Sequence, residues 1–287
     1  MSDQAKGLLI TLIGVLAIVP DSLFVRLIDA PTFTIVFWRA LTQGLVLLVI
    51  LLFIFGRRLP SKVRAVGLTA IPFGLLVTGS GVMFVASVQY TTIANTVLII
   101  ATVPVFAALA SWIWLGERIS RRMMWTMVFA IFGVAVIAYG SADPESKATL
   151  FGDALALAAA LMFALAITCA RSVRPVSITP IVPISFIILA VALFPFVDPW
   201  DVDPGDWVYV ALHGGVFVAL SSAMLSTGPQ YITSAEVALL ILLESLLAPV
   251  LAWIVVGEVP GVWSLWGGGI VLVTLVVSNV IALRRQK

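Results

Sequence analysis

Long apolar stretches follow one another along the whole chain, separated by short polar segments. A helix needs about 20 apolar residues to cross a bilayer. On that measure the chain holds ten spans, near residues 7–28, 33–55, 64–87, 91–115, 121–140, 150–170, 177–197, 207–228, 234–256 and 262–283. The pattern therefore predicts an all-α integral membrane protein with ten transmembrane helices and no room for a separate soluble domain.

One half of this pattern repeats the other. Gln89-Tyr90, Ala94, Trp112 and Gly116-Glu117 recur 141 residues later as Gln230-Tyr231, Ala235, Trp253 and Gly257-Glu258, while Gly7 and Arg26 recur 145 residues later as Gly152 and Arg171. Each copy holds five spans, and an odd number of crossings forces the second copy to enter the membrane upside down. We expect two inverted five-helix repeats, residues 1–140 and 150–287, joined by a linker at 141–149. Inverted repeats around a midplane site are typical of secondary transporters.

Composition supports a membrane protein. The 287 residues are 62% hydrophobic and 10% charged, and the mean hydropathy is +1.18, which no soluble core requires. The net charge of +2 does not indicate nucleic-acid binding, because the basic residues lie in short loops. Cys169 is the only cysteine, so an intrachain disulfide is excluded.

The positions of lysine and arginine predict the orientation, because cytoplasmic loops are enriched in both. With the N-terminus in the cytoplasm, 13 of the 16 basic residues lie on the cytoplasmic side: Lys6, Arg57, Arg58, Lys62, Arg64, Arg118, Arg121, Arg122, Arg171, Arg174, Arg284, Arg285 and Lys287. Arg26 and Lys147 then lie outside, and Arg39 lies within a span. We expect both termini to be cytoplasmic.

Two charged residues lie at the same depth in the first two spans. Asp21 follows Pro20, roughly 10 Å from the outer end of the first span, and Arg39 is about six residues from the outer end of the second. Only a short turn joins these helices, so we expect an Asp21–Arg39 ion pair. The pair either neutralises two costly charges or serves transport, with Arg39 holding a substrate carboxylate or Asp21 taking a proton. Pro20 cannot donate to Leu16, so the helix should be open beside Asp21.

Two further ionisable residues lie in the second repeat. Glu244 is close to the middle of the ninth span, and no lysine or arginine is expected at its depth. It is either a substrate or proton site, or a protonated, hydrogen-bonded structural acid. His213, the only histidine, lies near the outer end of the eighth span, where an interfacial hydrogen-bonding role and a cavity role both remain open. A lone histidine disfavours a metal centre, and we expect no metal and no other cofactor.

Two spans are polar along one side. The fourth carries Asn95 and Thr102, and the eighth carries Ser222. Hydroxyl groups often bond to their own helix without any functional role, whereas Asn95 must find partners elsewhere. Tyr90 opens the fourth span and is either a gate or an interfacial anchor.

These residues carry a family resemblance. The segment from Gln89-Tyr90-Thr91-Thr92-Ile93-Ala94 to Trp112-Ile-Trp-Leu-Gly-Glu117-Arg118-Ile119-Ser120 resembles the drug/metabolite transporter superfamily, and more narrowly its EamA-type repeat. The second copy matches through Gln230-Tyr231, Glu244, Pro249 and Gly257-Glu258, and Trp38-Arg39 resembles the start of the repeat's second helix. The first copy has Val103-Pro104 where the repeat typically has Glu-Pro, so a role for that acid falls to Glu244 alone.

The resemblance implies a central cavity from helices three, four, eight and nine and transport by alternating access. Bacterial members often export amino acids, whereas organellar members move nucleotide sugars or sugar phosphates, which need basic cavity residues. The spans offer only Arg39. An apolar cavity with Met83, Tyr90, Asn95 and Glu244 better suits a zwitterion.

We therefore expect export of aromatic or apolar amino acids across a bacterial inner membrane, with drugs, nucleosides and other metabolites as alternatives. The partners are then the substrate, the lipid bilayer and, where transport is coupled, protons. An intramembrane enzyme would need a catalytic cluster, and the sequence has no paired-Asp motif, no Gly-x-Gly-Asp and no Ser–His pair at a common depth. We expect no enzymatic activity, and a receptor or scaffold without transport stays open.

Overall fold

The fold was examined in a computed structural model that describes residues 3–143, 146–173, 176–227, 231–232 and 234–284. Gln230, Arg174, Arg285 and Lys287, which entered the sequence predictions, lie outside the described residues, as do residues 144–145 of the linker. Throughout the described ranges the regular structure is helical.

The first repeat contains α1 (Asp3–Ile18), α2 (Asp21–Leu27), α3 (Thr32–Phe55), α4 (Leu59–Val66), α5 (Ala70–Tyr90), α6 (Ile93–Ile100), α7 (Val103–Leu115) and α8 (Arg121–Ser141), with 3₁₀ turns η1 (Gly56–Arg58) and η2 (Gly67–Thr69) around α4. The second contains α9 (Leu150–Ser172), α10 (Ile181–Leu193), η3 (Phe194–Phe196), α11 (Trp207–Leu212), η4 (His213–Val218), α12 (Ala219–Thr227), α13 (Ser234–Val256) and α14 (Val262–Arg284). The protein therefore consists of two inverted sets of five crossings, as the sequence predicts.

Eight apolar segments in the described chain are long enough to span a bilayer. One of these eight, Thr32–Tyr90, is long enough for two crossings, which makes nine. The crossing expected at 177–197 is shorter than predicted, since its apolar helix covers Ile181–Phe196. With that helix the count reaches ten.

Three spans are interrupted. The first breaks at Pro20, which has no N–H to give to the preceding turn, so α1 ends at Ile18 and α2 begins at Asp21. The fourth breaks at Ala101-Thr102, just before Pro104, and separates α6 from α7. The eighth contains a π-helical segment, η4, between α11 and α12. Broken and π-helical segments free backbone groups inside the membrane, which is common at functional sites.

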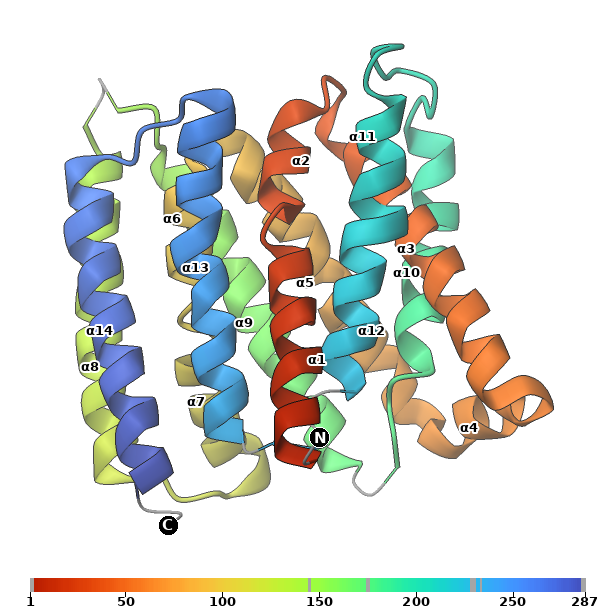
Figure 1. Ribbon diagram of the computed structural model, residues 1–287, viewed down its shortest axis with the longest axis horizontal. Helices are drawn as coiled ribbons and strands as arrows, with labels where there is room; N and C mark the ends of the chain where they lie inside the picture. The colour runs from red at the N-terminus through yellow and green to blue at the C-terminus, as the bar shows by residue number, and fades with distance from the viewer. Residues whose placement is uncertain (1–2, 144–145, 174–175, 228–230, 233, 285–287) are drawn as a thin grey trace.

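The helices run roughly parallel between two faces of the molecule (Figure 1). Both termini and α4 lie on one face, here called the terminal face. The upper end of α2 and the loop before α11 lie on the other, here called the opposite face (Figure 1). Both ends of an even number of crossings must meet at one face, so the arrangement agrees with ten spans.

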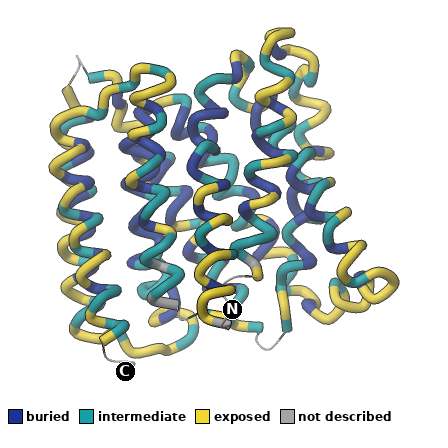
Figure 2. Tube along the Cα trace, viewed as in Figure 1, coloured by how far each residue is buried: buried dark blue, intermediate teal, exposed yellow. Residues whose placement is uncertain are grey.

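The repeats pack against each other in matched pairs. Helix α5 of the first repeat lies against α9 of the second, and α1 of the first lies against α12 of the second. Helices α3 and α8 of the first repeat pack on α10 and α14 of the second, respectively. The α8–α14 pair carries many exposed residues on its outer side (Figure 2). Several are large and apolar, such as Phe129, Ile131 and Phe132 of α8. In a bilayer these side chains face lipid tails, which are as apolar as the side chains themselves.

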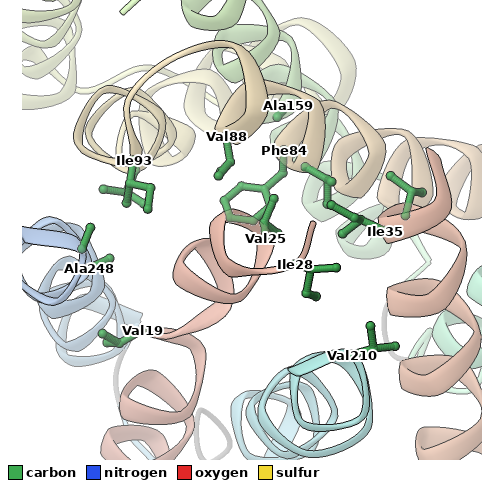
Figure 3. Packing of buried hydrophobic residues seen from close by; sticks show 14 of the residues in the cluster. Val19, Val25, Ile28, Ile35, Phe84, Val88, Ile93, Ala159, Val210 and Ala248 are labelled. Atoms are coloured by element: carbon green, nitrogen blue, oxygen red, sulfur yellow. The ribbon is translucent and has the colours of Figure 1, made fainter. Parts of the chain in front are cut away.

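The largest apolar cluster surrounds α2 near the opposite face. Val25 of α2 is fully buried, as are Val88 of α5 and Ile93 of α6. Ala248 and Ala252 of α13 join them from the second repeat. Figure 3 shows Val25 next to Phe84, with Ala248 facing α2 from the other repeat. Apolar residues of both repeats therefore pack together around α2.

Replacing Gly267 with alanine is expected to lower stability by about 1–3 kcal/mol, the usual cost of overpacking. A Cβ atom at Gly267 would lie 2.5 Å from the Gly133 carbonyl oxygen of α8, so the two helices would have to separate. Gly269→Ala is the matched control on the same helix, because a Cβ there meets no atom within 4 Å. Thermal unfolding in micelles measures the difference, and equal midpoints for the two variants would contradict it.

Candidate functional site

A bidentate ion pair lies inside the first helical hairpin, where the sequence placed it. Arg39 of α3 donates from Nε to Asp21 Oδ1 at 3.1 Å and from Nη2 to Oδ2 at 2.7 Å. The Asp21 side chain is 5% exposed and that of Arg39 11%. Two parallel charge-assisted bonds hold both groups in a fixed orientation. Asp21 is also the first residue of α2, where the helix dipole favours a negative charge.

His213 completes a buried triad with this pair. Its Nε2 lies 2.5 Å from Asp21 Oδ1, and the histidine is 1% exposed. Its ring also stacks on Phe24, with ring centroids 5.9 Å apart. The interfacial role left open for His213 is therefore wrong, because the side chain lies in the interior and binds the carboxylate of the other repeat.

Local structure brings His213 to this position. The residue begins the π-helical segment η4, which packs against α3. The next residue is Gly214, where a Cβ atom would lie 2.8 Å from the Arg39 carbonyl oxygen. A side chain at this position would push η4 away from α3, so the glycine permits the approach that joins His213 to Asp21.

Glu244 lies near this triad from the opposite repeat. It is half-buried on α13, and it is close enough to Asp21 and Arg39 to interact electrostatically with both. The expectation that no lysine or arginine lies at the depth of Glu244 is therefore wrong, because Arg39 is within electrostatic range of it. In the described chain no hydrogen bond to the Glu244 carboxyl group is found.

A second charged site lies at the opposite face. Arg26, Tyr90, Lys147, Glu258 and neighbouring residues line a pocket of about 460 Å³. Arg26 Nη2 lies 3.1 Å from Glu258 Oε2 and so joins the end of α2 to the loop between α13 and α14. The pocket combines two cations and one anion at a surface where both repeats meet.

Comparison with known proteins identifies the family. The model of the EamA-like transporter family matches residues 5–139 and again residues 150–280. The chain belongs to the EamA-like transporter family. It is therefore a membrane transporter of small molecules. An uncharacterized transporter of Archaeoglobus fulgidus is 25% identical over 263 residues, which cover 90% of each chain. A solved crystal structure aligns with 99% of both chains at a TM-score of 0.62 and 18% identity, which supports the fold.

In this EamA-like transporter Asn95 holds helices together. The residue is fully buried, and its Nδ2 donates to Ser141 Oγ at 2.8 Å and to Asp153 Oδ1 at 3.0 Å. Its Oδ1 accepts from the Ser264 hydroxyl. These bonds link α6 to α8, α9 and α14 and use both ends of the amide. The sequence-based assignment of Asn95 to the substrate cavity is corrected to helix packing.

Thr102 is likewise structural. It is 2% exposed and donates to the Ile99 carbonyl oxygen at 2.6 Å. The same carbonyl oxygen also accepts from the Thr102 backbone N–H at 3.0 Å, so the hydroxyl bonds to its own chain segment beside the break between α6 and α7. The polar face predicted for the fourth span therefore serves the fold at both Asn95 and Thr102.

The other sequence candidates lie in different surroundings. Met83 is partly buried against the apolar cluster around α2. Tyr90 is 50% exposed and lines the pocket at the opposite face, with its ring against Phe151. Ser222 accepts a 3.2 Å bond from Gln43 Nε2. Of these residues, only Ser222 belongs to a polar contact between α3 and α12 inside the membrane.

Gln43 is a site residue that sequence reasoning missed. It is 4% exposed, and its Oε1 has no hydrogen-bond partner in the described structure. A buried acceptor without a partner costs about 1–3 kcal/mol, so a ligand or water that reaches it is favoured. The signal was available, because Gln43 is one helical turn from Arg39 and the two lie on the same side of α3.

Proposed function

We propose that this transporter exports amino acids with aromatic or apolar side chains by alternating access, from a site between Arg39 and Glu244. The observation that carries the proposal is a paired arginine and an unpaired carboxyl group inside the same membrane-embedded region. Charged residues within membranes are costly and usually mark a substrate or ion path. A zwitterion carries the two charges that such a site complements.

Arg39 retains capacity for a substrate carboxylate. Nε and Nη2 bind Asp21, whereas no hydrogen bond from Nη1 to the described residues is found. A Cβ atom at Gly81 would lie 3.4 Å from Nη1, so the missing side chain leaves space beside this nitrogen. We assign Nη1 to the substrate carboxylate.

Glu244 and Gln43 suit the ammonium group. The Glu244 carboxyl group supplies an acceptor, and a negative charge when it is ionised. Gln43 Oε1 supplies a further buried acceptor. An ammonium group has three donors and no acceptor, so it satisfies both.

The surrounding side chains favour an apolar substrate. The Phe84 ring lies 5.7 Å from Arg39 Cζ, and Phe24 contacts both His213 and Phe217. Met83 adjoins the same cluster and can adapt its shape to a ligand. An aromatic or aliphatic side chain would bury its surface here, whereas a phosphate would lack the several basic partners it requires.

Asp21 and His213 are the groups that we propose for coupling. A proton on either one changes the charge of the triad, and the 2.5 Å contact between them provides a direct path for transfer. The orientation is proposed as well: the basic residues of α4 and its flanking turn lie on the terminal face. Cytoplasmic loops are enriched in such residues, which supports a terminal face in the cytoplasm of a bacterial cell.

Uptake of labelled amino acids into liposomes tests the function. We expect saturable flux of phenylalanine, tryptophan or leucine above protein-free liposomes, and little flux of sugar phosphates. A flux that rises with a pH gradient would support coupling through Asp21 or His213, and an unchanged flux would make the protein a facilitator. No flux of any amino acid would overturn the proposed substrate class and favour nucleosides, drugs or other metabolites.

A further inference from the structure

Two salt bridges join the repeats at symmetry-related positions. At the opposite face Arg26 of the first repeat binds Glu258 of the second. At the terminal face Arg171 of the second repeat binds Glu117 of the first, with Nη2 and Oε1 2.6 Å apart. Arg26 and Arg171 are repeat equivalents, and so are Glu117 and Glu258. We name these contacts the opposite-face pair and the terminal-face pair.

The two acidic residues stand on the same turn. Each follows a glycine of positive φ, 69° at Gly116 and 67° at Gly257, a region that favours glycine. Each backbone N–H donates to the carbonyl oxygen six residues earlier, Glu117 to Ser111 at 3.3 Å and Glu258 to Ala252 at 3.4 Å. The turn that ends the fourth span of one repeat therefore presents a carboxylate to the first span of the other.

The opposite-face pair is the more enclosed of the two. The Glu258 side chain is 12% exposed, against 46% for Glu117. Glu258 Oε1 accepts from Ile93 N at the start of α6, and Arg26 Nη2 donates to the Thr91 carbonyl oxygen at 2.7 Å. Directly below lies the apolar cluster around Val25, which includes residues of both repeats. In this conformation both pairs are formed.

We propose that the two pairs are the gates of the transport cycle, each holding one face shut and breaking when that face opens. The proposal rests on the alternating access proposed above. In an inverted repeat the same contact recurs at both faces. When the two repeats exchange conformations, one pair is therefore loosened while the other stays formed. The acids and arginines of these pairs position the repeats and do not contact the substrate.

Symmetry supplies a reporter for each gate. Native Cys169 is fully buried two residues before Arg171. Its neighbour Ala170 is the repeat equivalent of Val25, which is fully buried one residue before Arg26. Cys169 therefore reports opening at the terminal face. A Val25→Cys substitution in a Cys169→Ala background reports opening at the opposite face.

The test is the rate of labelling by a membrane-impermeant maleimide, added to either side of vesicles of known orientation. We expect Glu258→Gln to raise labelling of Val25→Cys from the opposite face about tenfold, because the broken pair is largely enclosed. We expect Glu117→Gln to raise labelling of Cys169 from the terminal face about threefold, since an exposed pair contributes less. Neither substitution should raise the other reporter.

The control is Asp201→Asn, an exposed acid in the loop before α11 at the opposite face, which should change neither rate. Unchanged rates in both gate variants, or a rise of both reporters in either variant, would overturn the gate assignment. Because labelling needs no substrate, the gate proposal and the substrate proposal can be overturned independently. If each variant raises only the reporter at its own face but no amino acid is transported, the substrate class is overturned. If amino acids are transported but the labelling does not follow this pattern, the gate assignment is overturned.

Discussion

Replacing Asp21 with leucine is expected to lower the free energy of unfolding by about 3–5 kcal/mol, the typical cost of breaking a buried ion pair by removing one partner. The guanidinium of Arg39 would lose both of its bonds to the carboxylate and would remain in the membrane interior without its hydrogen-bonded counter-ion. His213 would lose its partner at the same time. Titration of the purified protein with SDS in mixed micelles measures the loss.

The double variant Asp21→Leu/Arg39→Met is the control for this prediction. Removing both charges leaves neither member of the pair without its partner, and buried pairs replaced by apolar residues are often nearly neutral in stability. We expect the double variant to recover most of the stability lost in the single one. A double variant as unstable as Asp21→Leu would show that the pair acts by shape and not by charge.

Replacing Glu244 with glutamine is expected to reduce amino-acid flux by ten- to a hundredfold, because a hydrogen bond to a charged group contributes about 1.5–3 kcal/mol. The proposed ammonium contact would lose its ionic partner, while the size of the side chain stays the same. The unfolding midpoint should change little, since no hydrogen bond from the described residues to Glu244 would be lost. Initial rates of labelled phenylalanine uptake measure the effect.

Glu244→Asp keeps the charge and is the matched control, for which we expect partial flux with a raised KM. Flux of Glu244→Gln at the level of the unchanged protein would contradict a substrate role for this acid. A large drop in the unfolding midpoint of Glu244→Gln would instead assign Glu244 to the structure of α13.

The contacts that the sequence predicted best are local ones. Asp21 and Arg39 belong to adjacent helices joined by residues 28–31, so the rise of 1.5 Å per residue was enough to place them at one depth. The break at Pro20 followed from the missing N–H. The repeat and its inversion followed from spacing and from an odd number of crossings.

Contacts between distant segments could not be predicted in this way. His213 lies 192 residues from Asp21, and its approach depends on a π-helical segment and a glycine contact with α3. Hydropathy recognises neither feature, because a π-helix and an α-helix of the same composition are equally apolar. The same limit applies to Glu244, whose closeness to Arg39 depends on how α13 packs near the first hairpin.

Asn95 shows where polarity alone misleads. A polar residue in a membrane helix can face a cavity or join neighbouring helices, and both cases satisfy its hydrogen bonds. Only the positions of Ser141, Asp153 and Ser264 decided between them. The sequence by itself determined the number of spans, the inverted repeat and the first ion pair, because each depends on periodicity, parity or neighbouring helices. The tertiary structure alone decided which polar groups meet across the repeats, because those distances are set by helix packing that no pattern along one chain encodes.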